Sequence, residues 1–148
     1  MARNAVLLTL FLITVHIQHV LSITPQQYCF YGCNSVMYTI SFTDGYDPCT
    51  NPIALETNYY CAARYCSEAE INAGISLFVP ESKCEHPIPD FDSVLRGVKL
   101  DSIPIINYTA AVATYASKAD ALDHVVLPDE EFFDIAFRTV VSIHLEFV

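Results

Sequence analysis

The sequence predicts a mainly α-helical protein with minor β structure. Three observations support this fold class: apolar residues recur at spacings of three and four, six cysteines lie in the first 84 residues, and only short stretches look extended. We divide the chain into a signal peptide at 1–22, a small disulfide-stapled helical domain at 23–98, and a less constrained C-terminal segment at 99–148. This last segment combines extended pieces with an amphipathic helix.

The first 22 residues have the pattern of a secretory signal peptide. A short start containing Arg3 precedes an apolar run over residues 5–15, and polar residues at 16–19 interrupt that run before Ser22. A membrane-spanning helix needs about 20 apolar residues, which is more than this run provides. We therefore predict cleavage after Ser22 and a protein that is secreted or lies on the extracellular face of the plasma membrane. An uncleaved anchor is the alternative.

Composition and charge exclude several classes of protein. The 148 residues are 53% hydrophobic and 16% charged, which is too apolar for a disordered chain. The net charge of −10 repels phosphate backbones, so we predict no nucleic-acid partner. The same charge attracts cations, so weak cation binding stays open. Carboxylates cluster at Asp44/Asp47, Glu68/Glu70, Asp90/Asp92 and Asp129/Glu130/Glu131/Asp134. The helix dipole favours acidic residues at helix starts, which accounts for Glu68, Glu70, Asp129, Glu130 and Glu131.

All six cysteines follow the predicted cleavage site, at Cys29, Cys33, Cys49, Cys61, Cys66 and Cys84. An even number in a secreted chain predicts disulfide bonds. A zinc site is the alternative, but it favours C-x2-C pairs, whereas the short gaps here are C-x3-C and C-x4-C. Six cysteines allow fifteen pairings, and the sequence alone leaves the choice open. Our working hypothesis joins Cys33 to Cys61, Cys49 to Cys84 and Cys29 to Cys66.

Helical spacing begins at the first cysteine. Apolar positions from Cys29 to Ile40 share one helical face, although β-branched and aromatic residues at 38–42 leave a terminal strand open. Residues 43–48 are predicted to form a turn, because they combine glycine with proline. A helix is then predicted over Pro52–Cys66, with Asn51 as its N-cap.

A further helix follows directly. Residues Ser67–Glu70 form the S-x-x-E capping pattern before an apolar stripe, and Pro80 ends the predicted helix. Residues 85–89 are predicted to be an extended linker, because residues before proline avoid the helical backbone conformation. A short helix is predicted over 90–98, with Asp90 as its cap.

Short extended pieces are predicted at 103–106 and 125–127. The alanine-rich stretch 110–121 fits either a helix or a loop. Before it, Asn107-Tyr108-Thr109 is an N-glycosylation acceptor, which predicts a glycan on Asn107 at the protein surface.

The last predicted helix is amphipathic and begins after its cap, Asp129. Apolar residues at 132–141 have the spacing of a helix. Beyond Val141, apolar and polar residues alternate as far as Phe147, which predicts a strand. The abrupt end of this apolar run indicates a truncated gene product, or alternatively a terminal strand docked in a sheet.

Residues that carry chemistry are few. The sequence contains no G-x-S-x-G, H-E-x-x-H, C-x-x-C or phosphate-loop motif. After the predicted cleavage site it keeps His86, His124 and His144, and none of these forms a pair at helical spacing. We therefore predict no catalytic residue, no bound cofactor and no metal site.

Four stretches carry a family resemblance: 28–33 (YCFYGC), 49–52 with 60–66 (CTNP and YCAARYC), 67–74 with Cys84 and Pro89, and 132–140 (FFDIAFRTV). Together they resemble the extracellular N-terminal domain of fungal ferric/cupric reductases, the transmembrane components that reduce ferric chelates. The last stretch resembles the approach to the first membrane helix of that family. The similar regions cover about 28–97 and 125–147.

The resemblance implies an ectodomain linked to iron or copper reduction and uptake. Members of the family pass electrons from cytosolic NADPH through FAD and membrane haems to metal outside the cell. This sequence contains no second apolar span, no paired helical histidines and no nucleotide-binding domain, so no catalytic, haem, FAD or NADPH residue is carried over. We expect the chain to be inactive alone and to meet a membrane only through missing downstream segments. The alternative is a small secreted, disulfide-stabilised binding or effector-like protein with no reductase connection.

Overall fold

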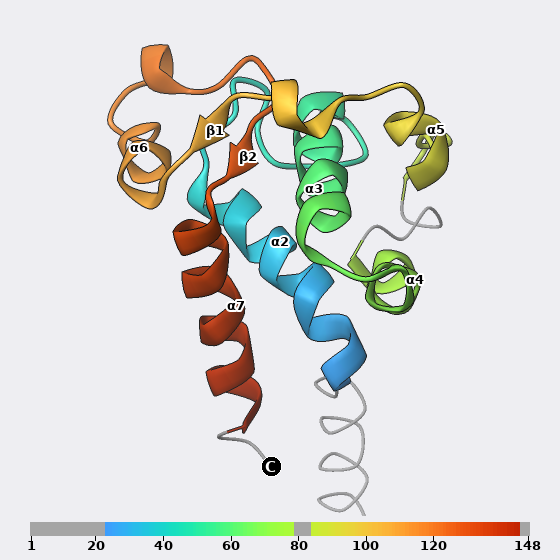
Figure 1. The fold of residues 1–148 in the computed structure, drawn as a ribbon. Coiled ribbons are helices and arrows are strands. Elements are labelled where there is room, and N and C mark those ends of the chain that lie inside the picture. Colours follow the sequence, from blue (N-terminus) through green and yellow to red (C-terminus); the bar gives the residue numbers. More distant parts are fainter. Residues whose placement is uncertain (1–22, 79–83, 146–148) are drawn as a thin grey trace, which may run out of the picture.

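The computed structural model describes residues 23–78 and 84–145 (Figure 1). It is mainly helical with a small sheet, which confirms the predicted fold class. The α-helices are α2 (Tyr28–Thr39), α3 (Pro52–Tyr65), α4 (Glu68–Phe78), α5 (Phe91–Leu95), α6 (Tyr108–Ala113) and α7 (Glu130–Leu145), and the strands are β1 (Ile105–Ile106) and β2 (Leu127–Pro128). The predicted signal peptide at 1–22, the predicted helix stop at Pro80 and the last residues of the predicted strand lie outside the described residues.

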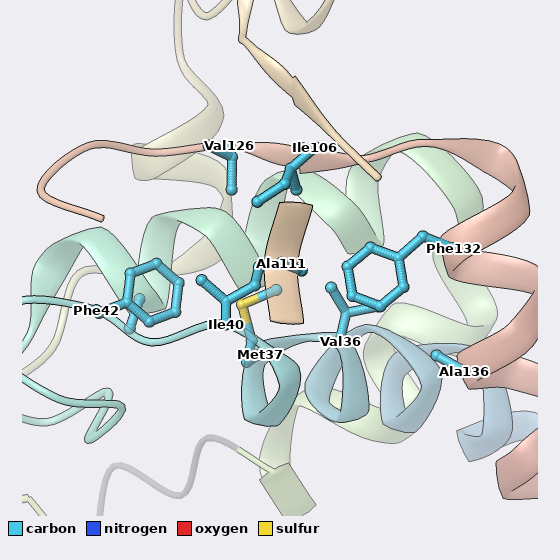
Figure 2. Close-up of a cluster of buried hydrophobic side chains, with 10 residues drawn as sticks. Val36, Met37, Ile40, Phe42, Ile106, Ala111, Val126, Phe132 and Ala136 are labelled. Atoms are coloured by element: carbon cyan, nitrogen blue, oxygen red, sulfur yellow. The ribbon is translucent and has the colours of Figure 1, made fainter. Parts of the chain in front are cut away.

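Helix α2 is the central element of the fold. It packs against α7, α3 and α4, and in Figure 1 it crosses the molecule between α7 and α3. Toward its C-terminal end, Val36 and Met37 are fully buried and share a core cluster with Phe132 and Ala136 of α7 (Figure 2). Burial of these apolar side chains therefore holds the cysteine-free C-terminal segment against the disulfide-bonded part of the chain.

A second buried cluster joins α2, α3 and α4. Phe30 of α2 is fully buried among Leu55 and Tyr59 of α3 and Ile71 of α4. The ring of Phe91 lies edge-on to Tyr59 with centroids 5.2 Å apart, which adds α5 to the same cluster. One face of the first turns of α2 thus packs against elements from the stapled region.

Local capping signals set the helix starts. The Oδ1 atom of Asn51 accepts from the backbone N–H of Ile53 at 2.9 Å, and its Nδ2 donates to the carbonyl of Gly45 at 2.7 Å. Gly45 has φ +81°, as the predicted turn requires. At the start of α4, the Glu70 carboxylate accepts from the Ser67 N–H at 2.8 Å, which confirms the predicted capping pattern.

The capping hydrogen bond at the start of α5 also changes the pKa of the capping residue. Asp90 accepts from the Ser93 N–H at 2.9 Å, and this hydrogen bond holds the pKa of the Asp90 carboxyl below its usual value. The helix ends at Leu95, earlier than the predicted boundary at 98. Gly97 follows with φ +79°, a conformation that a helix cannot contain.

The predicted extended pieces pair as a parallel two-stranded sheet. Ile105 lies opposite Leu127 and Ile106 opposite Pro128. The terminal strand left open at 38–42 does not form: α2 continues to Thr39, and Phe42 makes one isolated bridge with Leu122. The alanine-rich stretch is divided, because α6 ends at Ala113 and a 3₁₀ turn follows at Lys118–Asp120.

The predicted strand after Val141 is wrong, since α7 continues as a helix to Leu145. Packing explains the difference. Val140 is 3% exposed, and the ring of His144, one turn later, lies 5.5 Å from the ring of Tyr28 at the start of α2. In a helix Val140 and His144 lie one turn apart, about 6 Å along the axis, and both can reach α2, whereas a strand would separate them by about 13 Å.

One glycine permits the close approach of α4 to α2. A Cβ atom added at Gly74 would lie 2.8 Å from Cγ of Phe30 and closer still to its Cβ. Because Phe30 is fully buried, its ring has no free space into which to move. The spacing of these two helices therefore depends on the missing side chain.

Replacing Gly74 with alanine is expected to destabilise the fold by about 1–3 kcal/mol, the usual cost of overpacking a core. Alanine favours the helix by up to about 1 kcal/mol, so the steric penalty outweighs the gain in helix propensity. Denaturant unfolding measures the difference. The matched control is Asn72→Ala at an exposed position of the same helix, which should be neutral or stabilising. Equal stability of the two variants would contradict the close contact.

Within the described ranges, no helix is long and apolar enough to cross a membrane.

Candidate functional site

The cysteines form three disulfide bonds, which confirms both their oxidation and the hypothesised pairing. The bonds are Cys29–Cys66, Cys33–Cys61 and Cys49–Cys84, and no cysteine is free. The first two join α2 to the C-terminal end of α3, because Cys29 and Cys33 lie one turn apart on the same face of α2. The zinc alternative is wrong for these residues, since each sulfur is already bonded to another sulfur.

The predicted carboxylate clusters serve helix starts and turns. Asp129 accepts from the N–H of Phe132 at 2.8 Å, and Asp47 accepts from the N–H of Cys49 at 2.9 Å. Glu68 and Glu70 lie in the first turn of α4. These contacts account for the positions of the carboxylates through backbone capping and the helix dipole. In the part of the chain that the structure describes, no group of three or more His, Cys, Asp or Glu residues is arranged to hold a metal ion.

The structure does not bring the three histidines together. The ring nitrogen Nδ1 of His124 lies 3.0 Å from the Asp123 carboxylate, and this contact lowers the pKa of Asp123. His144 packs against tyrosine rings at the start of α2, and His86 is exposed in the loop after Cys84.

A cleft of about 710 Å³ opens beside the first turns of α7. It combines aromatic rings with charged side chains and is lined by Tyr65, Glu130, Glu131, Phe133, Asp134 and Arg138. The residues come from α7 and from the last turn of α3, which are far apart in the sequence.

Two stacked rings form the apolar part of this acidic cleft. The rings of Tyr65 and Phe133 are nearly parallel, with an interplanar angle of 5° and centroids 4.3 Å apart. The Tyr65 hydroxyl donates to the carbonyl of Pro128 at 2.7 Å. Burial raises the pKa of Tyr65, and the carboxylates of Asp129 and Glu130 add to the increase against the opposing effect of Arg64. Tyr65 therefore remains a neutral hydrogen-bond donor at physiological pH.

The charged side of the acidic cleft is only partly neutralised. Nε of Arg138 lies 2.8 Å from a carboxylate oxygen of Asp134, and both side chains are solvent-accessible. Glu130 and Glu131 are exposed at the start of α7. Such a surface can stack planar groups and attract positive charge.

We expect Tyr65→Phe to destabilise the protein by about 1 kcal/mol, because it removes the hydrogen bond to Pro128 and keeps the ring stack. The matched control is Tyr115→Phe. The Tyr115 hydroxyl also donates to a carbonyl, that of Tyr38, at 2.7 Å, but this tyrosine is 60% exposed. At this exposed position water can replace the lost hydrogen-bond partner. The Tm measured by thermal unfolding should therefore fall less for Tyr115→Phe than for Tyr65→Phe. A larger effect at Tyr115 would refute this assignment.

The predicted glycosylation residue lies beside a smaller hollow. Asn107 is exposed and caps α6, with its Oδ1 accepting from the Ala110 N–H at 2.8 Å. The hollow has a volume of about 260 Å³ and is lined by Asn107, Tyr108, Thr109, Asp129, Glu131, Phe132 and Ile135. The rings of Tyr108 and Phe132 meet edge to face with centroids 5.6 Å apart. This hollow lies between α6 and α7.

Reasoning from the sequence missed the acidic cleft. The sequence pattern places Phe133 in the amphipathic helix and Tyr65 near the end of another predicted helix, and it gives no indication that the two rings meet. Their contact joins positions 68 residues apart, so no local periodicity could indicate it. The one available signal was the cluster of carboxylates at the start of α7.

A scan against protein-family models found no match for this chain, and searches of curated proteins and of solved structures found none either.

Proposed function

We propose that the chain is an extracellular, disulfide-braced head that resembles the ectodomain of fungal ferric/cupric reductases and is not catalytic by itself. The observation that carries the proposal is the pair of disulfides between α2 and α3. Such bonds persist in oxidising compartments and are rare in the cytosol. They support a protein that acts outside the cell.

The covalent framework coincides with the sequence resemblance. The stretch 28–33 contains Cys29 and Cys33, and the stretch 60–66 contains their partners Cys61 and Cys66. The residues that resemble the reductase ectodomain are thus those that join the two helices. This agreement supports a shared structural role for these stretches.

In the proposed role the chain supplies a rigid extracellular surface beside a metal-reducing membrane domain. The start of α2 and the end of α7 lie at the same end of the molecule (Figure 1), and α7 contains the stretch that resembles the approach to a membrane helix. The opposite end, with β1, β2 and α6, then faces away from the membrane. The excess of carboxylates favours the approach of metal cations through long-range attraction.

The test begins with the full-length transcript. If the proposal holds, the reading frame continues beyond residue 148 into several apolar spans with paired histidines. A stop codon directly after residue 148 would contradict it and favour the free secreted protein. Independently, purified chain mixed with NADPH and a ferric chelate should produce no ferrous iron. Reduction of the ferric chelate by the purified chain would contradict the non-catalytic role, whether or not the reading frame continues.

A small secreted binding protein is the second candidate, and one observation favours it. Aromatic and aliphatic side chains are exposed around α6, where Tyr108, Val112 and Tyr115 are between 45% and 60% exposed at helical spacing. Tyr38, 61% exposed, adjoins them through the hydrogen bond that its carbonyl accepts from Tyr115. Exposed apolar groups of this kind are typical of surfaces that bind partners.

A further inference from the structure

We infer that Asn107 carries an N-glycan whose first N-acetylglucosamine packs into the hollow between α6 and α7. The inference rests on the proposed function in one respect, because glycosylation requires passage through the secretory pathway. Two independent features meet at this place: an acceptor tripeptide, and a hollow that has the acceptor asparagine in its wall. Asn107-Tyr108-Thr109 is the sole Asn-x-Ser/Thr tripeptide in the sequence.

The walls of the hollow match the two kinds of surface that a sugar presents. Tyr108 and Ile135, 48% and 43% exposed, offer apolar surface to the C–H face of a pyranose ring. Asp129 and Glu131 offer carboxylate oxygens, which accept hydrogen bonds from hydroxyl and acetamido groups. One oxygen of Asp129 already accepts from Phe132, and its second oxygen provides further acceptor capacity.

The size of the hollow and the position of Asn107 in its wall indicate that the first sugar of the glycan occupies it. The hollow has a volume of about 260 Å³, less than half that of the acidic cleft at about 710 Å³, which suits a single hexosamine residue rather than a whole glycan. Because Asn107 is itself part of the wall, an attached sugar is held at the hollow at a high effective concentration. A free saccharide would have to bind without this advantage.

Attachment is compatible with the cap of α6. In the transfer, a bond forms between Nδ2 of Asn107 and C1 of the sugar, while the bond between C1 and the pyrophosphate of a lipid-linked oligosaccharide breaks. Nδ2 loses one proton and the lipid pyrophosphate leaves. Oδ1 takes no part in the new bond, so it continues to accept from the Ala110 N–H. The helix start is therefore the same with and without the glycan.

The test uses the full chain secreted from a eukaryotic host, with two enzymatic treatments of the same material. One endoglycosidase trims the glycan to a single N-acetylglucosamine, and a peptide N-glycosidase removes it entirely and converts Asn107 to aspartate, which also caps helices well. We expect Tm to stay unchanged after trimming and to fall by about 3 °C after complete removal, the shift that one modest packing interaction gives in a domain of this size.

Variants provide the matched controls. Thr109→Ala abolishes the acceptor and should reproduce the lower Tm, whereas Thr109→Ser keeps the acceptor and should keep the higher Tm. Ile135→Ser removes one apolar wall at an exposed position, and in this background the difference in Tm between trimmed and fully deglycosylated protein should become smaller. The NMR spectrum of the trimmed protein should show contacts between the acetamido methyl group and the Tyr108 ring.

Failure of the inference and failure of the proposed function give different results. A chain secreted without any glycan mass would overturn the inference and leave the proposed location outside the cell intact. A glycan that is present but leaves Tm and the Tyr108 ring signals unchanged on removal would overturn the packing in the hollow alone. A chain that is not secreted and carries no glycan would overturn both.

Discussion

Replacing Phe132 with alanine is expected to destabilise the protein by roughly 3–5 kcal/mol, the usual range for truncating a buried phenylalanine. Phe132 is 1% exposed and lies in the cluster that contains Val36 and Met37 of α2. The substitution removes the Phe132 ring from this cluster and leaves a cavity that neighbouring side chains cannot fill completely. Because these contacts join the two parts of the chain, the whole fold should lose stability in one cooperative transition.

The control for Phe132 is Ile143→Ala in the same helix. Ile143 is 49% exposed, so truncating it should change stability by less than about 0.5 kcal/mol. Urea unfolding followed by far-ultraviolet circular dichroism measures both variants. If Phe132→Ala left the midpoint near that of the unmodified protein, or if α7 unfolded in a separate earlier transition, the docking of α7 on α2 would be refuted.

Helix starts were predictable because capping is local in the sequence. The acceptor side chains of Asn51, Asp90 and Asp129 each bond a backbone N–H within three residues. Ser67 and Glu70 form a similar local pair. Both partners of each capping hydrogen bond lie within a few residues of each other in the sequence. These helix starts can therefore be predicted without the tertiary structure.

The end of α7 and the acidic cleft were not predictable for the opposite reason. Alternation after Val141 covers few residues, and a short apolar pattern fits either a strand or one face of a helix. The burial of Val140 and the contact of His144 with Tyr28 of α2 favour the helix over the strand. The stack of Tyr65 on Phe133 likewise exists only because α3 and α7 converge, which no spacing in the sequence expresses.

Removing the Cys33–Cys61 bond through the double variant Cys33→Ala/Cys61→Ala should cost about 3–4 kcal/mol. Cys33 and Cys61 lie between Cys29 and Cys66 in the sequence, so the outer bond already restricts the unfolded chain. The inner bond therefore removes less entropy from the unfolded chain than it would alone. With the outer bond intact, Cys33 lies only four positions after Cys29, and Cys66 lies only five positions after Cys61. The inner bond therefore closes a short ring in the unfolded chain, worth about 2.5 kcal/mol in the chain-entropy model, rather than a loop of 28 residues.

The remaining cost comes from the core. Cys33 and Cys61 are both fully buried, so alanine at both positions deletes two sulfur atoms from a packed cluster and adds about 1 kcal/mol. The comparison is Cys49→Ala/Cys84→Ala, which removes a bond between partly exposed cysteines and loses loop closure without a buried cavity. Guanidinium unfolding, with a thiol count to verify that the other two bonds remain, measures both variants. If the inner double variant kept full stability, the bond between α2 and α3 would not brace the core, and the structural basis for an extracellular head would fail with it.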